Sequence, residues 1–268
     1  MRPTTRSRGA TDLPFHAIFV SLGSCYIILV VAMLAAGVSF TSPGQLWIAL
    51  QSPEIRYAFR LSLLSCTIAT ILSLWVAVPL AYYLARFDFR GKSIIEAIVD
   101  VPIVLPPLVV GLLLLILFQS VPGRTIESWF SVTYEIPSVI LAQFSVACAF
   151  AIRTLRVTFD QLDPRQEDVA RTLGCSRMEA FMRVVLPEAT PGILAAATIA
   201  WARALGEFGP ILVFSGATRM KTEVLPTTVF LELSVGNLES ALAVSLLMVI
   251  LATAVLGIAR LLGMKGGI

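Results

Sequence analysis

Long apolar runs separated by short polar segments dominate the pattern of this chain. Six such runs cover residues 17–40, 59–84, 94–118, 137–159, 192–214 and 241–262. A run of about 20 apolar residues is long enough to cross the hydrocarbon core of a bilayer as one α-helix. The pattern therefore predicts an all-α membrane protein with about six transmembrane helices.

The composition supports this interpretation, because 57% of the residues are hydrophobic and only 14% are charged. Such values exclude an ordinary soluble domain. We expect a basic tail over 1–16, followed by one transmembrane domain over 17–268. The first apolar run is longer than the 7–15 residues usual in a signal peptide, so an uncleaved span is favoured over a cleaved signal.

The basic residues indicate an orientation. With the N-terminus inside, only five of the 20 Lys and Arg residues fall in outer segments, namely Arg56, Arg60, Arg124, Arg219 and Lys221. This asymmetry satisfies the positive-inside rule and predicts that both termini are cytoplasmic. The location that we expect is a cell membrane, the inner or plasma membrane of a bacterium. The net charge of +3 therefore reports topology, and we expect membrane lipid rather than nucleic acid as a partner.

Little in the sequence suggests chemistry within the chain. Cys25, Cys66 and Cys148 lie in apolar runs and Cys175 in a charged segment, with no pairing or zinc-ligand spacing, and His16 is the single histidine. No phosphate-binding loop is present. We expect no catalytic residues, no metal and no cofactor, so any ATP hydrolysis would come from a partner subunit. A membrane-embedded enzyme is a minor alternative.

A charged segment over 160–191 carries helix signals of its own. Asp163, Pro164 and Gln166 are typical of a helix start, and Gly174 of a helix end. A capping box then begins a second helix, which we expect prolines to stop; the residues concerned are Ser176, Glu179, Pro187 and Pro191. The pattern predicts a helix–turn–helix with one apolar face, and an amphipathic linker lying on the bilayer is the alternative.

This segment resembles the EAA signature of ABC-importer permeases. The residues that match in spacing are Asp168, Val169, Ala170, Gly174, Val184, Leu186 and Pro187. Asp168, Val169 and Val184 replace the Glu, Ala and Ile of the signature. The resemblance implies that the segment docks on a cytoplasmic ATPase and that these seven residues couple its motion to the membrane helices.

The third apolar run contains Pro102, Pro106, Pro107 and Gly111. Prolines interrupt a helix, and a membrane tolerates the freed carbonyls only where protein or water satisfies them. We expect a discontinuous helix that faces the bundle interior, with a simple kink as the alternative. This stretch resembles the third-span motif of molybdate-type permeases.

Two ionisable residues lie four positions apart in the fifth apolar run, Arg203 and Glu207. Charges in hydrocarbon are costly, so these side chains should pair or line a water-filled path. A purely structural pair and a role in the path are both open at this point. Gly206, Gly209 and Pro210 weaken the helix beside them.

The run 203–209, which includes Phe208, resembles the fifth-span motif of molybdate and tungstate permeases. Sulfate permeases have a similar stretch, usually with Tyr at the position of Phe208. Pro210 stands where a small residue is commoner, and this departure leaves the exact anion open. The resemblance implies a translocation path that includes Pro106, Pro107, Arg203, Gly206, Glu207, Phe208 and Gly209.

Together these resemblances imply the type I ABC importer (MetI-like) permease fold. They further imply a homodimer, cytoplasmic ABC ATPase subunits and an extracytoplasmic oxyanion-binding protein, with molybdate or tungstate as cargo. A sulfate or thiosulfate permease is the alternative. An ATP-independent secondary transporter or channel is a further one, although the EAA-like segment has no evident purpose without an ATPase.

Overall fold

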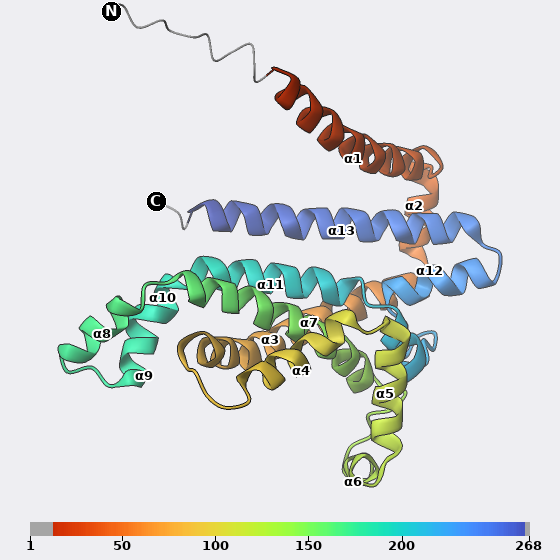
Figure 1. The fold of residues 1–268 in the computed structure, drawn as a ribbon. Helices are drawn as coiled ribbons and strands as arrows, with labels where there is room; N and C mark the ends of the chain where they lie inside the picture. The colour runs from red at the N-terminus through yellow and green to blue at the C-terminus, as the bar shows by residue number, and fades with distance from the viewer. Residues whose placement is uncertain (1–12, 266–268) are drawn as a thin grey trace, which may run out of the picture.

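The computed structural model describes residues 13–265, so Arg2, Arg6 and Arg8 of the predicted tail lie outside it. The described residues form helices and no strand (Figure 1). The long helices are α1 (Leu13–Ser39), α3 (Pro53–Arg86), α7 (Ile136–Gln161), α11 (Thr190–Leu205) and α13 (Leu238–Lys265). The shorter helices are α2 (Pro43–Gln51), α4 (Lys92–Val104), α5 (Pro107–Gln119), α6 (Val121–Trp129), α8 (Pro164–Thr172), α9 (Arg177–Ala180), α10 (Leu186–Glu188) and α12 (Leu225–Ser234), with π-helical segments η1 (Phe181–Val185) and η2 (Ile211–Ser215).

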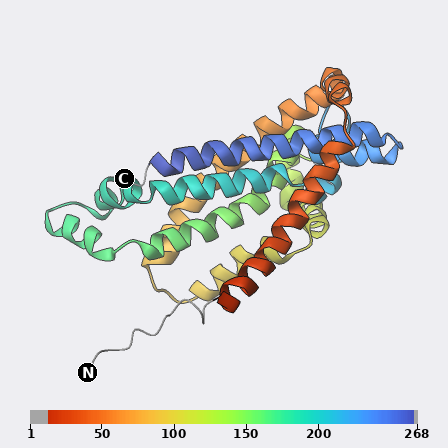
Figure 2. The ribbon, with the colours of Figure 1, turned by 90° about the horizontal axis from the view of Figure 1, so that it is seen from above.

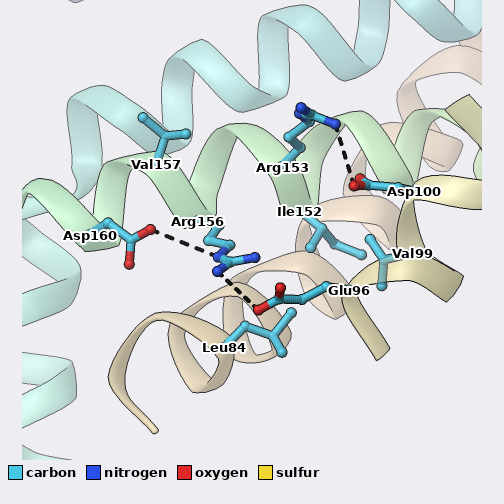
Figure 3. A pocket seen from close by; sticks show the side chains of 9 residues that line it. All are labelled: Leu84, Glu96, Val99, Asp100, Ile152, Arg153, Arg156, Val157 and Asp160. Atoms are coloured by element: carbon cyan, nitrogen blue, oxygen red, sulfur yellow. Dashed lines mark ion pairs between the residues drawn. The ribbon is translucent and has the colours of Figure 1, made fainter. Parts of the chain in front are cut away.

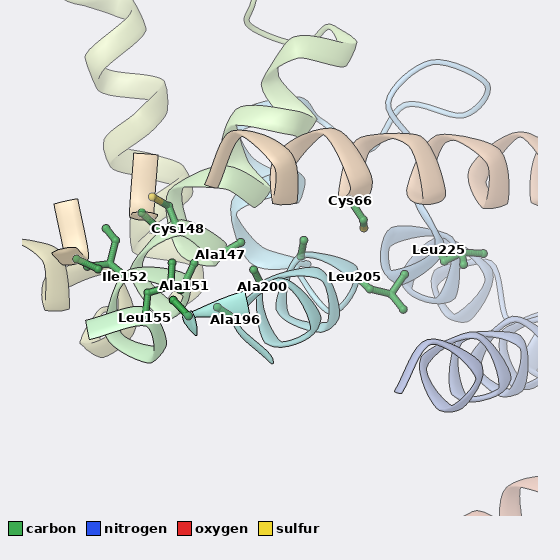
Figure 4. Close-up of a cluster of buried hydrophobic side chains, with 14 of the residues drawn as sticks. Cys66, Ala147, Cys148, Ala151, Ile152, Leu155, Ala196, Ala200, Leu205 and Leu225 are labelled. Atoms are coloured by element: carbon green, nitrogen blue, oxygen red, sulfur yellow. The ribbon is translucent and has the colours of Figure 1, made fainter. Parts of the chain in front are cut away.

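The helices α3, α7 and α11 pack together as the centre of the bundle, and α13 packs on α11. Their contact surfaces are lined by small residues, many of them fully buried: Ala77, Ala81, Ala147, Ala151, Ala196, Ala200 and Ala204 (Figure 4). Small side chains let helix backbones approach closely, which favours association in a membrane, where burial of apolar surface gives little advantage. By contrast, α1 stands apart from the other long helices (Figure 1), and none of its span is buried.

Four helices are long and apolar enough to cross a membrane: Phe15–Ser39, Pro53–Arg86, Ile136–Gln161 and Leu238–Ile258. Two further candidates are bent pairs, Lys92–Val104 with Pro107–Gln119 and Arg177–Glu188 with Thr190–Leu205. Counting each bent pair as one span gives the six that the sequence predicts. The protein is therefore a multi-pass membrane protein, with bends where the sequence places its prolines and glycines.

The third apolar run is discontinuous, as predicted. Leu105 and Pro106 separate α4 from α5, and the two helix axes are bent by 114°. Pro107 begins α5, a position where a missing N–H costs nothing. A simple kink would change the helix direction by much less. The run therefore does not cross the bundle as one straight helix, and α5 points away from the bundle (Figure 1).

The second helix of the charged segment ends at Glu188, between Pro187 and Pro191, the two prolines expected to stop it. Helical backbone continues from Arg177 to Glu188, and Pro187 lies inside it. The π-helical segment η1, just before this proline, has wider turns than an α-helix. The carbonyl four residues before Pro187 is therefore displaced from the position where it would clash with the proline ring. The chain bends by 70° only after Glu188, before α11 begins with Pro191 in its first turn.

Candidate functional site

The charged segment folds as its capping residues predict; its part between α7 and α11 (residues 162–189) is here called the coupling loop, after the role that its sequence predicts. The Asp163 carboxylate accepts a hydrogen bond from the backbone N–H of Arg165 at 3.0 Å. Gly174 has φ +96°, a left-handed conformation that favours glycine. Ser176 and Glu179 form the predicted reciprocal capping box. Gln166, expected in a capping role, instead donates to Glu188 Oε1 at 3.0 Å and so joins the two ends of the loop.

Several large apolar side chains of the coupling loop are exposed. Val169, Leu173, Met178 and Met182 each expose more than half of their surface. The loop extends beyond one end of the bundle (Figures 1 and 2). Exposed apolar side chains among many charges are typical of a protein-binding segment.

The predicted coupling residues divide into exposed and buried positions. Asp168 is exposed, with its carboxylate 3.8 Å from the Arg171 guanidinium. Ala170 is buried under the loop. The others range from half-buried to exposed: Val184 and Leu186 are half-buried, and Val169, Gly174 and Pro187 are exposed.

The residues predicted to form a path lie together around one cavity of about 280 Å³. Its lining is Pro106, Pro107, Leu108, Arg203, Gly206, Glu207, Phe208 and Gly209. All seven predicted positions are present, and Leu108 is the one lining residue that the sequence did not suggest. The cavity lies where the break before α5 meets the end of α11, so two separate interruptions in the sequence create one site.

Arg203 and Glu207 are paired in this cavity, as their spacing predicts. Arg203 Nη1 lies 2.9 Å from Glu207 Oε2. The burial is unequal, because the Glu207 side chain is 1% exposed and that of Arg203 is 29% exposed. The Arg203 guanidinium also lies 5.8 Å from the ring centroid of Phe150 on α7. Among the described residues, no side chain or backbone group donates a hydrogen bond of good geometry to Glu207, so this carboxylate depends on Arg203.

Close backbone contacts hold the cavity together. A Cβ on Gly209 would lie 2.9 Å from the backbone of Pro107 and Leu108, and one on Gly111 would lie 2.7 Å from Pro210 Cα. Real side chains do not approach backbone so closely. These two glycines therefore allow α5 and the chain after α11 to touch.

We expect Gly209→Ala to destabilise the protein, while Gly206→Ala is tolerated. Overpacking of this kind costs about 1–3 kcal/mol, whereas a Cβ on Gly206 meets nothing closer than 3.8 Å. Thermal melting of the purified protein in detergent measures the difference. Equal melting temperatures for the two variants would contradict the close contact between Gly209 and Pro107.

A second polar cluster lies between α4 and α7, at a cavity of about 270 Å³ (Figure 3). The Arg156 guanidinium lies 2.9 Å from Glu96 and 3.8 Å from Asp160, and that of Arg153 lies 3.4 Å from Asp100. This cluster was not predicted from the sequence. The signal was present, because Glu96 and Asp100 fall inside a predicted span, where carboxylates need partners.

The segment 216–224 also holds groups that the sequence analysis did not single out. Glu223 is fully buried there, and burial raises the pKa of its carboxyl group. Arg219 nearby forms an ion pair with Glu232 at 2.8 Å. The sequence indicates only a polar loop here, so the burial of Glu223 was not predictable. Within residues 13–265, no group of three or more His, Cys, Asp and Glu side chains could hold a metal ion.

Comparisons with known proteins agree with this architecture. Residues 77–265 match the family described as "Binding-protein-dependent transport system inner membrane component". The chain is 38% identical to the molybdate/tungstate transport system permease protein WtpB of Pyrococcus abyssi, over 76% of this chain and 79% of that protein. It is 33% identical to the sulfate transport system permease protein CysT of Escherichia coli, over 87% and 84%.

Solved structures share the fold at low sequence identity. A bacterial ABC transporter involved in import of the polysaccharide alginate aligns with a TM-score of 0.77 and 17% identity, over 95% of this chain and 96% of that one. The inward-facing MetNI methionine ABC transporter aligns with a TM-score of 0.63 and 18% identity, over 85% and 100%. The family match covers more than half of the sequence, and the fold agrees with it. The chain therefore belongs to the family of inner-membrane permease components of binding-protein-dependent ABC importers.

Proposed function

We propose that this chain forms the translocation path of an ATP-driven importer for molybdate or tungstate. The observation that carries the proposal is the cavity in which a partly exposed Arg203 stands beside the broken backbone of two helices. A cationic side chain in a mostly apolar environment lowers the barrier for a dianion. Broken helices at such a cavity are typical of transport sites in membrane proteins.

The coupling loop and this cavity lie at opposite ends of one helix. α11 has 16 residues, which corresponds to about 24 Å at the rise of an α-helix. It begins just after the bend that follows Glu188 and ends at Leu205, directly before Gly206. In the proposed mechanism, closure of the ATPase dimer draws the coupling loops together, and α11 carries this displacement to Arg203 and Glu207.

The proposal places the coupling loop and both chain ends in the cytoplasm, according to the distribution of basic residues. The exposed Val169, Leu173, Met178 and Met182 would bind the ATPase. A second copy of this chain would complete the path, and an external binding protein would deliver the oxyanion. ATP binding then acts by favouring one of two permease conformations, since the ATPase binds them with different affinities.

Glu207 has a role in release in this mechanism. Its negative charge, 2.9 Å from Arg203, offsets part of the attraction for an anion. A path must bind its cargo weakly enough to let it leave. High affinity for the oxyanion would then belong to the binding protein rather than to the permease.

The cargo is assigned from relatives. Molybdate, tungstate and sulfate are all tetrahedral dianions, which one arginine cannot distinguish by charge. The 38% identity to the molybdate/tungstate permease exceeds the 33% identity to the sulfate permease, and this favours molybdate and tungstate. Sulfate or thiosulfate is the second candidate, because the sulfate permease aligns over a larger share of the chain.

Uptake by vesicles tests the proposal. The vesicles contain this chain, its ATPase and its binding protein, and radiolabelled molybdate, tungstate and sulfate are offered singly and in competition. We expect uptake of molybdate or tungstate that requires ATP inside the vesicle. Uptake that is independent of ATP would establish a secondary transporter instead, and a preference for sulfate over both other anions would change the cargo.

A further inference from the structure

A buried polar contact joins the coupling loop to α3. It has no part in the transport cycle proposed above. The Tyr82 hydroxyl donates a hydrogen bond to Glu167 Oε1 at 2.7 Å. Arg86 Nε lies 3.9 Å from Glu167 Oε2. Glu167 is the residue before Asp168, yet it is buried while Asp168 is exposed. A buried carboxylate is stable only with partners, so these contacts fix the orientation of α8.

Arg86 also contacts the end of α7. Its Nη2 donates to the carbonyl of Leu162 at 3.0 Å, the residue that follows the last turn of α7. Carbonyls at a helix end lack partners within the helix, so a guanidinium there is favourable. One arginine on α3 therefore holds both the end of α7 and the carboxylate on α8.

The ring of Tyr82 packs between the same elements. Its centroid lies 5.7 Å from that of Phe159 on α7 and 4.5 Å from that of Phe181 in η1. Tyr82 is 9% exposed. A single side chain of α3 thus touches the last helix before the coupling loop, the first helix of the loop and its π-helical segment.

A proline lies in α3 just before these residues. Pro79 lies inside α3, about one turn before Tyr82. A proline in a helix removes one backbone hydrogen bond and weakens the helix at that point. This weak point would let Tyr82 and Arg86, which follow it, move with the coupling loop without displacing the whole of α3.

We propose that Tyr82, Arg86 and Glu167 are positioning residues that make the end of α3 move with the coupling loop. The loop then drives two helices, α11 through the chain at Glu188 and α3 through this contact. This inference rests on the proposed import function. It assigns the three residues a part in transmitting the ATPase cycle, and no contact with the cargo.

The test compares Tyr82→Phe with Tyr83→Phe in vesicles that contain the complete complex. Tyr83, the neighbouring tyrosine on α3, is about half exposed, and its ring packs on Phe87 and Phe89. In the described part of the chain, its hydroxyl has no hydrogen-bond partner. The measured quantity is the amount of molybdate taken up per ATP hydrolysed. We expect this ratio to fall at least roughly fivefold for Tyr82→Phe, the lower end of typical coupling effects, and to stay native for Tyr83→Phe.

Two further measurements separate transmission from stability. Melting temperature and co-purification of the ATPase are expected to be close to native for Tyr82→Phe, because the ring and its aromatic contacts remain. Glu167→Ala, which removes the acceptor of the Tyr82 hydroxyl, should lower uptake per ATP in the same way. The double variant Tyr82→Phe/Glu167→Ala should be no worse than Glu167→Ala alone, since the tyrosine hydroxyl then has no partner to lose.

Each outcome decides between the proposals. A native ratio for Tyr82→Phe, or additive effects of the two substitutions, would overturn this inference and leave the import function standing. A lower melting temperature with a native ratio would show a structural contact alone. Absence of ATP-dependent uptake in the native complex would contradict the import function itself.

Discussion

Gly174→Val is expected to lower ATP-driven uptake at least roughly tenfold, while Gly236→Val leaves it near native. Both glycines have positive φ, +96° and +79°, and a Cβ on either would meet no neighbour within 4 Å. A β-branched residue in this conformation costs about 1–3 kcal/mol, and 1.4 kcal/mol is about a tenfold change in an equilibrium constant. The substitution therefore disfavours the native turn of the coupling loop without creating a clash.

Gly236 is a matched control because it occupies the same type of helix end. At the end of the first helix, the backbone N–H of Gly174 donates to the carbonyl of Arg171 and that of Cys175 to the carbonyl of Ala170, each at 3.1 Å. At the end of the second, the backbone N–H of Gly236 donates to the carbonyl of Leu233 at 3.1 Å and that of Asn237 to the carbonyl of Glu232 at 2.9 Å. Both helices therefore end in the same glycine motif, in which two backbone hydrogen bonds close the last turn. The Gly236 turn joins α12 to α13, at the other end of the bundle from the coupling loop (Figure 1). Equal loss of uptake in the two variants would show that general instability, and not the coupling loop, explains the effect.

Arg203→Gln is expected to destabilise the protein by about 3–5 kcal/mol, the usual cost of breaking a buried pair and leaving one charge unpaired. Glu207 is 1% exposed and has no other partner among the described residues. Glu207→Gln should cost much less, because the Arg203 side chain is 29% exposed and borders the cavity. Thermal melting in detergent of the two single variants measures this asymmetry.

The double variant Arg203→Gln/Glu207→Gln separates a structural pair from a role in transport. It removes both charges, so we expect it to recover much of the stability that Arg203→Gln loses. If Arg203 lowers the barrier for the anion, uptake by the folded double variant should still fall more than roughly tenfold. Native uptake by the double variant would show that the pair only holds the bundle together. Additive stability losses in the single and double variants would contradict the direct contact.

The sequence determined those features that depend on neighbouring residues. Capping residues of the coupling loop act over three or four positions, so Asp163, Gly174 and the Ser176–Glu179 box were predictable from local chemistry. The pairing of Arg203 with Glu207 followed from helical spacing. Six apolar runs and the break at Pro106 and Pro107 were likewise predictable, since length and proline act locally.

Only the tertiary structure decided which distant residues meet. The cavity unites Pro106 and Pro107 with the stretch after α11, about a hundred residues later in the chain, and Gly111 and Gly209 allow that contact. Glu167 is one residue from the motif and was not distinguished from other surface charges, because its burial depends on Tyr82 and Arg86 of another helix. That the helix passes Pro187 before it ends at Glu188 was not predictable, because a π-helical segment before the proline relieves the clash that a regular helix would have. Periodicity and capping describe single segments, whereas burial and pairing between segments depend on how the helices pack.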